Sequence, residues 1–326
     1  MVGSVAARPA WAQQAAHQRL RIALAAFSVP APLIADKGNN PAWRAMYLEL
    51  RRLGYIEGEN LIVDRFSAEG QAERLGDMAR EIVKRHPDVI LSEGNGIARA
   101  LAAATTTIPI VSWMGDPIAF RLVASLARPD GNITGISVDA GWELAAKQLE
   151  ILKEIVPSAT KIAYMNLRAN LLPDRPDIKF RREAERKLNI EAIDFLFNEP
   201  TPTEYNRLFA AAARQKVDAL SVGPSAELFT ERLLIIDLAN EYRLPASYWY
   251  PECVTDGGLM SYGPDLTGLS RHVARQVHQI LSGSKVSDVP VYQPERFPFF
   301  LNLKTAEALG LTVPRMLLAR ADKVIE

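Results

Sequence analysis

The sequence predicts an α/β fold with two doubly wound parallel-sheet lobes. From Arg21 onward, apolar strand-like runs alternate with segments whose apolar residues recur at helical spacing, which is the pattern of βαβ units. This alternation runs through twice, and 326 residues exceed the usual size of one domain. Two such lobes would face each other across a cleft with the carboxyl ends of their strands, so we expect binding loops there.

The first series contains the elements of one lobe. Strands are expected at Arg21–Phe27, Leu61–Phe66, Asp88–Leu91, Ile108–Trp113 and Ile133–Val138. Helices between them are expected at Trp43–Leu53, Glu73–Arg85 and Gly96–Ala104, where apolar residues follow helical spacing. Gly54 ends the first of these helices.

The second series repeats this plan after a switch near residues 115–140. It opens with a helix at Trp142–Val156, which ends at Pro157. Strands are then expected at Lys161–Met165, Glu191–Phe195, Ala219–Val222 and Pro245–Tyr248. The helices between and after them are expected at Lys179–Leu188, Glu204–Arg214 and Glu227–Tyr242.

The stretch 257–265, GGLMSYGPD, interrupts the rhythm of strands and helices. We interpret it as a strand that returns the chain to the first lobe, a hinge crossing outside the interior of either sheet, because its glycines let the backbone bend. The alternative is an ordinary βα turn within one lobe. The next helix, Asp265–Leu281, would pack on the first lobe, and FPFFLNLKTAEALGL adds one more strand and helix.

Composition and motifs narrow the class of function. The 38 basic side chains balance 38 acidic ones, without the basic stripe of a nucleic-acid binder. Cys253 is the single cysteine, and His272 and His278 are spaced i, i+6, so they do not share a helix face for metal binding. The motifs of acyl transfer, zinc hydrolysis and nucleotide binding are absent from the sequence. We therefore expect no cofactor and no metal, whereas an enzyme that uses unpatterned carboxylates is an alternative that this scan would not detect.

Residues 1–19 are interpreted as a truncated export signal or disordered leader. A small-x-small pattern fits a cleavage site after Ala12, whereas the positive n-region and long apolar region of a signal peptide are missing. A disordered alanine-rich tail is the alternative. No later run approaches the roughly 18 apolar residues of a membrane span.

Three segments carry a resemblance to a known family. They are IPIVSWMGDPIAFRLVASLARPDGNITGISV (108–138), GGLMSYGPDLTGLSRHVARQVHQILSG (257–283) and FLNLKTAEALGLTVPRMLLARADKVIE (300–326). Together with LGYIEGENLIVDRFSAEGQAERL (53–75), HPDVILSEG (86–94) and LEILKEIVPSATKIAYM (149–165), they resemble the ABC-transporter substrate-binding proteins of the tryptophan/tyrosine type. The resemblance spans nearly the whole chain after the leader.

The resemblance implies a type I periplasmic-binding-protein fold, with two α/β lobes joined by a multi-strand hinge. Lobe 1 would comprise residues 20–134 and about 261–300, and lobe 2 residues 135–260, while the lobe of residues 301–326 stays open. It also implies a periplasmic monomer that closes on one small ligand, catalyses no reaction and hands the ligand to an ABC permease in the inner membrane. A ligand-sensing module with a signalling partner is the alternative. The loops 28–43 and 166–177 depart from the family pattern, so the identity of the ligand does not transfer.

The loop from Ser92 to Gly96, SEGNG, is the first candidate for ligand binding. It follows a buried strand and opens a helix, so Gly94 and Gly96 would let backbone amides approach a ligand while the helix N-terminus favours an anion. Glu93 and Asn95 would add side-chain contacts. The alternative is a tight βα turn without a ligand.

Other candidates follow the ends of the remaining strands. Asp116 would pair with a ligand amine, or with Glu93 as an acid/base pair, and its alternative role is the N-cap of a helix that begins at Pro117. Met114 offers apolar surface, although strand alternation turns it away from Trp113. The full set of expected ligand-binding residues is Phe27, Ser28, Glu93, Gly94, Asn95, Gly96, Met114, Asp116, Ser137, Asn166, Pro224, Tyr248 and Tyr250. The aromatic residues 248–250 have the alternative role of filling the core of the second lobe.

Overall fold

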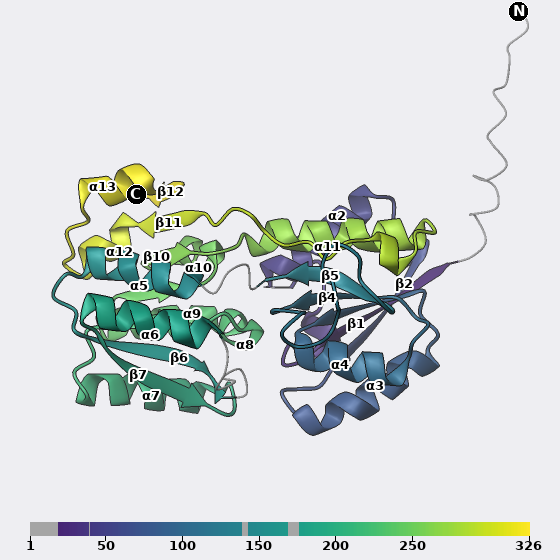
Figure 1. Cartoon of the computed structure of the whole chain (residues 1–326), viewed down its shortest axis with the longest axis horizontal. Helices are drawn as coiled ribbons and strands as arrows, with labels where there is room; N and C mark the ends of the chain where they lie inside the picture. Colours follow the sequence, from purple (N-terminus) through teal and green to yellow (C-terminus); the bar gives the residue numbers. More distant parts are fainter. Residues whose placement is uncertain (1–18, 39, 139–142, 169–175) are drawn as a thin grey trace, which may run out of the picture.

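The computed structural model describes residues 19–38, 40–138, 143–168 and 176–326 and consists of two α/β lobes (Figure 1). Residues 1–18 of the expected leader lie outside the described residues, as do residues 139–142 and most of the loop 166–177. The predicted fold class is confirmed, because each lobe is built around its own sheet of mainly parallel strands. No helix in the described part of the chain is long and apolar enough to cross a membrane.

Lobe 1 contains a five-stranded parallel sheet in the order β2-β1-β3-β4-β5. The strands are β1 (Leu20–Ala26), β2 (Leu61–Ser67), β3 (Val89–Glu93), β4 (Ile110–Met114) and β5 (Ile133–Ser137). The connecting helices are α2 (Pro41–Arg52), α3 (Leu75–Lys84) and α4 (Asn95–Ala104), with short 3-10 helices η1 (Ala31–Leu33) and η2 (Ala72–Arg74). This strand order reverses between β1 and β3, where a doubly wound sheet opens a crevice for a ligand.

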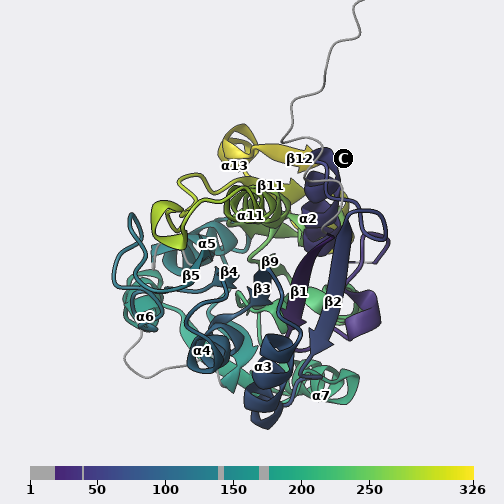
Figure 2. The same ribbon diagram turned by 90° about the vertical axis from the view of Figure 1, so that its right-hand side faces the viewer.

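Helices cover both faces of the first sheet, and α11 (Leu266–Leu281) lies beside α2 on one of them (Figure 2). The side chains of β1 alternate between these faces, as the two-residue period of a strand requires. Ile22 and Leu24 pack in the cluster that contains α2 and α11 residues, whereas Ala23 and Ala25 pack with α3 and α4. The alanines let α3 and α4 approach the sheet closely.

Lobe 2 contains a seven-stranded sheet in the order β12-β11-β10-β9-β8-β6-β7. The strands are β6 (Lys161–Leu167), β7 (Glu191–Phe197), β8 (Ala219–Val222), β9 (Ala246–Tyr248), β10 (Met260–Tyr262), β11 (Phe299–Asn302) and β12 (Lys323–Ile325). Strands β6 to β10 repeat the order of lobe 1, and β11 then pairs antiparallel with β10.

Helices on both faces complete the second lobe. They are α5 (Glu143–Ile155), α6 (Pro176–Leu188), α7 (Pro202–Arg214), α8 (Ala226–Thr230), α9 (Arg232–Glu241), α10 (Pro251–Thr255), α12 (Leu303–Ala308) and α13 (Arg315–Arg320), and a 3-10 helix η4 (Val286–Asp288) follows α11. Core residues of α5 pack with those of α12 and α13, while α7 and α9 belong to the other cluster. The prediction of a single helix over 227–242 is wrong, because the chain forms two helices, α8 and α9, that are separated at Glu231.

The interpretation of GGLMSYGPD is wrong in one respect. Its strand, β10, lies inside the seven-stranded sheet between β9 and β11 and is the counterpart of β5 in lobe 1. The crossing to lobe 1 follows the strand, at residues 263–265, and leads into α11. Gly263 is required there because a Cβ atom would lie 1.9 Å from the backbone oxygen of Trp249.

The chain passes between the lobes three times, after β5, after β10 and before β11. The third passage begins beside the first, because Tyr292 donates its amide to the carbonyl of Gly135 at 2.9 Å and accepts from the amide of Ser137 at 2.8 Å. The C-terminal strand β12 completes the second sheet beside β11. Segments distant in sequence therefore form a multi-strand hinge.

Candidate functional site

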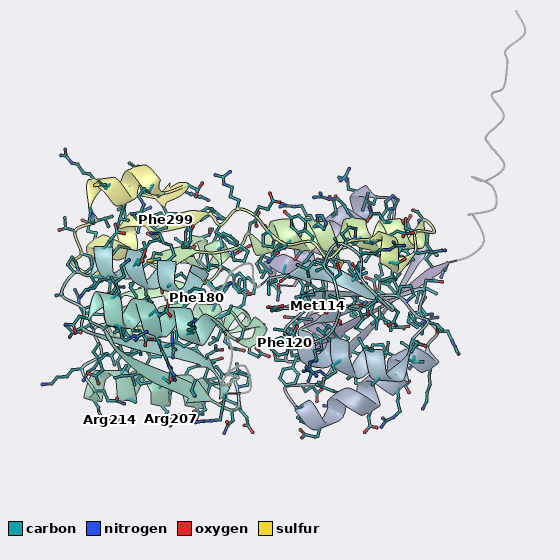
Figure 3. The ribbon with its side chains drawn as sticks, viewed as in Figure 1. Met114, Phe120, Phe180, Arg207, Arg214 and Phe299 are labelled. Carbon is teal, nitrogen blue, oxygen red and sulfur yellow. The ribbon has the colours of Figure 1, made fainter. Side chains whose placement is uncertain are left out.

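A cavity of about 390 Å³ lies between the two lobes and receives side chains from both. Its lobe 1 walls come from the ends of β1, β3 and β4 and from the start of α2, and its lobe 2 walls from the end of β6 and the loops after β8 and β9. Figure 3 shows Met114 and Phe120 on the part of lobe 1 that faces lobe 2. The cavity has the size and position of a small-molecule site in doubly wound sheets.

The SEGNG loop forms the polar part of the lobe 1 wall. Gly94 adopts a φ of 93°, which favours glycine, and places the start of α4 at the cavity. Its amide donates to the carbonyl of Trp113 at 2.8 Å, while the side chain of Asn95 accepts from the amide of Gly115 at 3.0 Å. No side chain in the described ranges caps the first turn of α4, so its backbone amides are available to an anionic group.

Glu93 lines the cavity at the end of β3. Its Oε2 atom is buried and has no hydrogen-bond partner among the described residues. Burial, and then the negative charge of Glu227, raise the pKa of the Glu93 carboxyl to about 8. Glu93 therefore holds a proton over much of the neutral pH range.

Glu227 enters the same cavity from lobe 2. Ser225 caps α8 by accepting from the amide of Leu228 at 3.1 Å, and this cap fixes the first turn that carries Glu227. Burial raises the pKa of the Glu227 carboxyl, and hydrogen bonds from its own amide and from Ser225 partly oppose that change. The third charged side chain among the described lining residues is Arg99, which is exposed.

Aromatic side chains form the apolar walls. In lobe 1, Trp43 of α2 meets Trp113 of β4 edge to face, with ring centroids 5.0 Å apart at 66°. In lobe 2, Tyr250 and Phe229 meet at 5.1 Å and 77°. All four line the cavity, so each lobe contributes an aromatic pair that offers large, rigid surface to an apolar or planar ligand.

The structure brings most of the expected residues to this cavity. Those that line it are Phe27, Glu93, Gly94, Asn95, Gly96, Met114, Asn166, Pro224 and Tyr250. Trp113 and Met114 pack in different clusters, as strand alternation requires, yet both line the cavity because it lies beyond the end of β4. Their role in binding a ligand stays a prediction.

Four expected residues do not line the cavity: Ser28, Asp116, Ser137 and Tyr248. Asp116 accepts from the amides of Ile118 and Ala119 at 3.0 and 2.9 Å, so it caps a turn, and the helix expected at Pro117 is replaced by that turn. The acid/base pair of Asp116 with Glu93 is therefore not assembled in this cavity.

The other three residues, Ser28, Ser137 and Tyr248, lie within the protein framework and not at the cavity. Ser137 donates its hydroxyl to the carbonyl of Gly115 at 2.9 Å, and the hydroxyl of Ser28 is buried with no hydrogen-bond partner in the described chain. Tyr248 is 1% exposed and lies in the core of lobe 2, as its alternative role anticipated, because it is on the interior strand β9. Of the aromatic residues 248–250, Tyr250 is the one that lines the cavity.

Sequence reasoning missed several lining residues. Helical spacing places Trp43 in a helix, but it does not indicate that the first turn of α2 lines the cavity. Asn40 caps that helix by accepting from the amide of Ala42 at 2.9 Å, and an Asn-Pro pair before an apolar helix is a signal that could have been used. Glu227 follows the Gly-Pro-Ser turn after β8, which already indicated a strand end.

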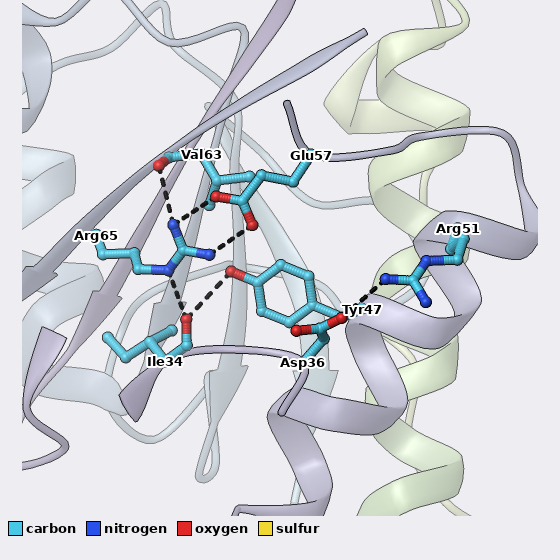
Figure 4. Close-up of polar contacts among 7 residues, drawn as sticks. All are labelled: Ile34, Asp36, Tyr47, Arg51, Glu57, Val63 and Arg65. Carbon is cyan, nitrogen blue, oxygen red and sulfur yellow. Dashed lines mark hydrogen bonds and ion pairs between the residues drawn. The ribbon is translucent and has the colours of Figure 1, made fainter. Parts of the chain in front are cut away.

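An interaction network anchors the loop between β1 and α2 (Figure 4). The Arg65 Nε donates to the carbonyl of Ile34 at 2.6 Å, and its two Nη atoms contact the Glu57 carboxylate at 2.7 and 2.6 Å. The Tyr47 hydroxyl donates to the same Ile34 carbonyl at 3.2 Å. Because Phe27 precedes this loop and Asn40 follows it, the network supports one wall of the cavity.

Comparisons with known proteins agree with this arrangement. A sequence profile of the family described as ABC transporter substrate binding protein matches residues 43–325. The tyrosine-binding protein of Clostridioides difficile (strain R20291) is 26% identical over 280 residues, which are 86% of this chain and 79% of that protein.

Two solved structures cover 94% of this chain and 100% of their own. A conserved domain protein from Vibrio cholerae has a TM-score of 0.78 at 25% identity, and an ABC domain from Streptococcus pneumonia in complex with L-Trp has 0.77 at 23%. The fold is the expected type I periplasmic-binding-protein fold, shared with transporter solute-binding proteins at TM-scores of 0.59 and 0.58.

Proposed function

Because the chain belongs to the family of ABC transporter substrate-binding proteins, we propose that it captures one aromatic amino-acid-like ligand between its lobes for an ABC importer. The observation that carries this proposal is the cavity to which each lobe contributes an aromatic pair. A planar side chain between these pairs would contact both lobes. A ligand that contacts both lobes stabilises the closed arrangement relative to the open one.

The polar groups of the cavity suit the other end of such a ligand. The uncapped first turn of α4 offers backbone amides to a carboxylate, and the carboxyl groups of Glu93 and Glu227 offer acceptors to an amine. The described lining residues include no cation apart from the exposed Arg99, so an anion would rely on backbone amides. The ligands named for two related proteins, tyrosine and L-Trp, each have a carboxylate, an amine and an aromatic ring.

The remaining parts of the proposal follow from the transport role. Substrate-binding proteins of ABC importers are extracytoplasmic, so we place this protein in the periplasm, as a monomer that delivers its ligand to a permease in the inner membrane. It would release the ligand unchanged and needs no cofactor. Recovery of intact ligand after prolonged incubation tests the absence of catalysis, and conversion of the ligand would contradict it.

Thermal unfolding against a panel of ligands tests the proposed ligand class. The panel contains L-tryptophan, L-tyrosine, L-phenylalanine, L-leucine, L-glutamate and a nucleoside. A ligand at 100 times its dissociation constant adds about 2.7 kcal/mol of stability, which raises the unfolding midpoint of a chain this long by about 4 °C. We expect such a shift with at least one aromatic amino acid and none with L-glutamate. A shift confined to the nucleoside would contradict the proposed ligand class.

A further inference from the structure

Two carboxyl groups from opposite lobes line the same cavity. Glu93 lies at the end of β3 in lobe 1, and Glu227 lies in the first turn of α8 in lobe 2. Glu227 is 8% exposed and Glu93 is half-buried with its Oε2 atom buried, and the ion pairs among the described residues include neither of them. Buried carboxylates in proteins are ordinarily paired with a cation, so within the described part of the chain this pair lacks its positive partner.

The described residues around the cavity do not supply that partner. Arg99 of α4 lines the cavity, but it is exposed, and its contact is a long hydrogen bond of 3.4 Å from Nη2 to the Phe120 carbonyl. Tyr250 is the remaining ionisable group that lines the cavity in the described chain. In lobe 2, burial and then the charges of Glu231 and Glu227 raise the pKa of the Tyr205 hydroxyl, so Glu231 is a further acidic side chain on this side.

We propose that Glu93 and Glu227 together bind the positively charged nitrogen of the ligand, and that the ligand-free pair holds one proton, which binding releases to solvent. This inference rests on the proposed function, because it assigns the amine of that ligand to these two side chains. Each carboxylate belongs to a different lobe, so one ammonium group between them would connect the lobes directly. The pair thereby selects amines over otherwise identical molecules that lack the positively charged nitrogen.

The proton follows from the electrostatics of the free cavity. Two carboxylates that line one cavity, with no cation beside them among the described residues except the exposed Arg99, disfavour each other's ionisation, so the pair titrates as a unit. Burial and the charge of Glu227 raise the pKa of Glu93 to about 8. An ammonium group stabilises both ionised forms, so the proton must leave before or as the cation binds. Affinity for an amine should therefore rise with pH until the pair is ionised in the free protein.

The experiment compares ligands that differ by one amine. L-Tryptophan and 3-(indol-3-yl)propionate share the ring and the carboxylate, and L-tyrosine and 3-(4-hydroxyphenyl)propionate form a second pair. Isothermal titration calorimetry at pH 6.0, 6.5, 7.0 and 7.5, in two buffers of different ionisation enthalpy, measures both affinity and proton release. We expect release of about one proton per bound amine at pH 6.5, and about a tenfold gain in affinity per pH unit. The analogues without the amine should release none.

Variants assign the effect to the pair. Glu93→Gln and Glu227→Gln preserve the shape of the side chain but cannot carry the charge, so each should abolish proton release and flatten the pH dependence. Each should also reduce the ratio of the affinity for the amine to the affinity for its analogue without the amine by about 30-fold or more. This value is at the lower end of the range for a buried charge pair that loses one partner. Glu252→Gln is the matched control, because the Glu252 Oε2 atom is also buried, the pKa of this carboxyl is raised to about 7, and Glu252 does not line this cavity.

The outcomes separate the inference from the proposed function. Equal affinity for L-tryptophan and its analogue, independent of pH and without proton release, would overturn the inference and leave the receptor role intact. Failure of every aromatic ligand to bind would overturn the proposed ligand class and the role of the pair with it. Loss of proton release in Glu252→Gln would also overturn the assignment. Because proton release is measured on the wild-type protein, the inference is tested even where one variant fails to fold.

Discussion

Replacing Arg65 with alanine is expected to lower the stability of the protein and weaken ligand binding, although Arg65 does not line the cavity. The reason is the network of Figure 4, in which Arg65 connects β2 to the loop that runs from Phe27 to Asn40. The Ile34 carbonyl would lose its charged donor at 2.6 Å and keep the Tyr47 hydroxyl at 3.2 Å. The loop would then be held less firmly against lobe 1.

The magnitude follows from the separate contacts of Arg65. A hydrogen bond from a charged donor contributes about 1.5–3 kcal/mol when it is partly buried. The ion pair with Glu57 adds less than about 1 kcal/mol, because the two side chains are 22% and 40% exposed and solvent screens them. We expect a loss of about 2–3 kcal/mol, which lowers the unfolding midpoint by roughly 3–5 °C.

The assay pairs thermal unfolding with calorimetric titration of an aromatic amino acid. Arg51→Ala is the matched control, because Arg51 contacts the same loop through Asp36 at 2.8 Å but is 55% exposed. It should change stability by less than about 1 kcal/mol. The stability loss of Arg65→Lys should lie between those of Arg51→Ala and Arg65→Ala, since lysine keeps the charge but not the planar guanidinium group. Equal losses from Arg65→Ala and Arg51→Ala, or a midpoint within 1 °C of wild type for Arg65→Ala, would refute this reasoning.

Further predictions concern the cavity and the hinge. Burial raises the pKa of Glu93 in the folded protein to about 8, above its ordinary value of 4.5. The protonated carboxyl therefore contributes its full stability below pH 4.5, and this contribution is lost as the pH rises toward 8. Glu93→Gln should raise the unfolding midpoint more at pH 8 than at pH 5, and an equal change at both pH values would contradict this prediction. Asp116→Ala should lower the free energy of unfolding by about 1 kcal/mol, because the turn loses its side-chain hydrogen bonds, and should leave the ligand affinity in titrations unchanged. A large loss of affinity would instead place Asp116 at the ligand. Tyr250→Ala should weaken ligand binding at least tenfold, while Tyr250→Phe, which keeps the ring, should retain most of the affinity. Similar affinities for the two variants would argue against contact between the ring and the ligand. Gly135→Ala should destabilise by about 3 kcal/mol or more in denaturant unfolding, because its Cβ would lie 2.0 Å from the Ser112 carbonyl oxygen, and a wild-type midpoint would refute that clash.

Much of the fold was predictable because its signals are local. Apolar runs and helical spacing placed β1 to β5 within a few residues, and Pro and Gly residues marked the ends of the helices. The break between α8 and α9 was not predictable, because both halves share apolar spacing and the interruption at Glu231 is a one-residue change in backbone geometry. The place of β10 also needed the sheet itself, since its pairing partners β9 and β11 come from both sides of the α11 crossing.

The candidate site was predictable where it depends on strand ends. Phe27, Glu93 and Asn166 end or follow strands, and the doubly wound plan brings those ends to the cleft. Position along the chain could not say which way a neighbouring side chain points. Tyr248 and Tyr250 are two residues apart, but Tyr248 belongs to a buried strand and Tyr250 lies beyond its end.

The sequence by itself determined the alternation of strands and helices, the repetition of that plan and the loop whose glycines open α4. These features depend on neighbouring residues, whose spacing and backbone freedom are properties of the chain. The tertiary structure alone decided that Trp43 would meet Trp113, that Asp116 would cap a turn away from the cavity, and that Glu93 and Glu227 would line one cavity from opposite lobes. Burial and electrostatic fields arise from residues far apart in sequence, so the properties of a buried carboxyl pair exist only once both lobes are in place.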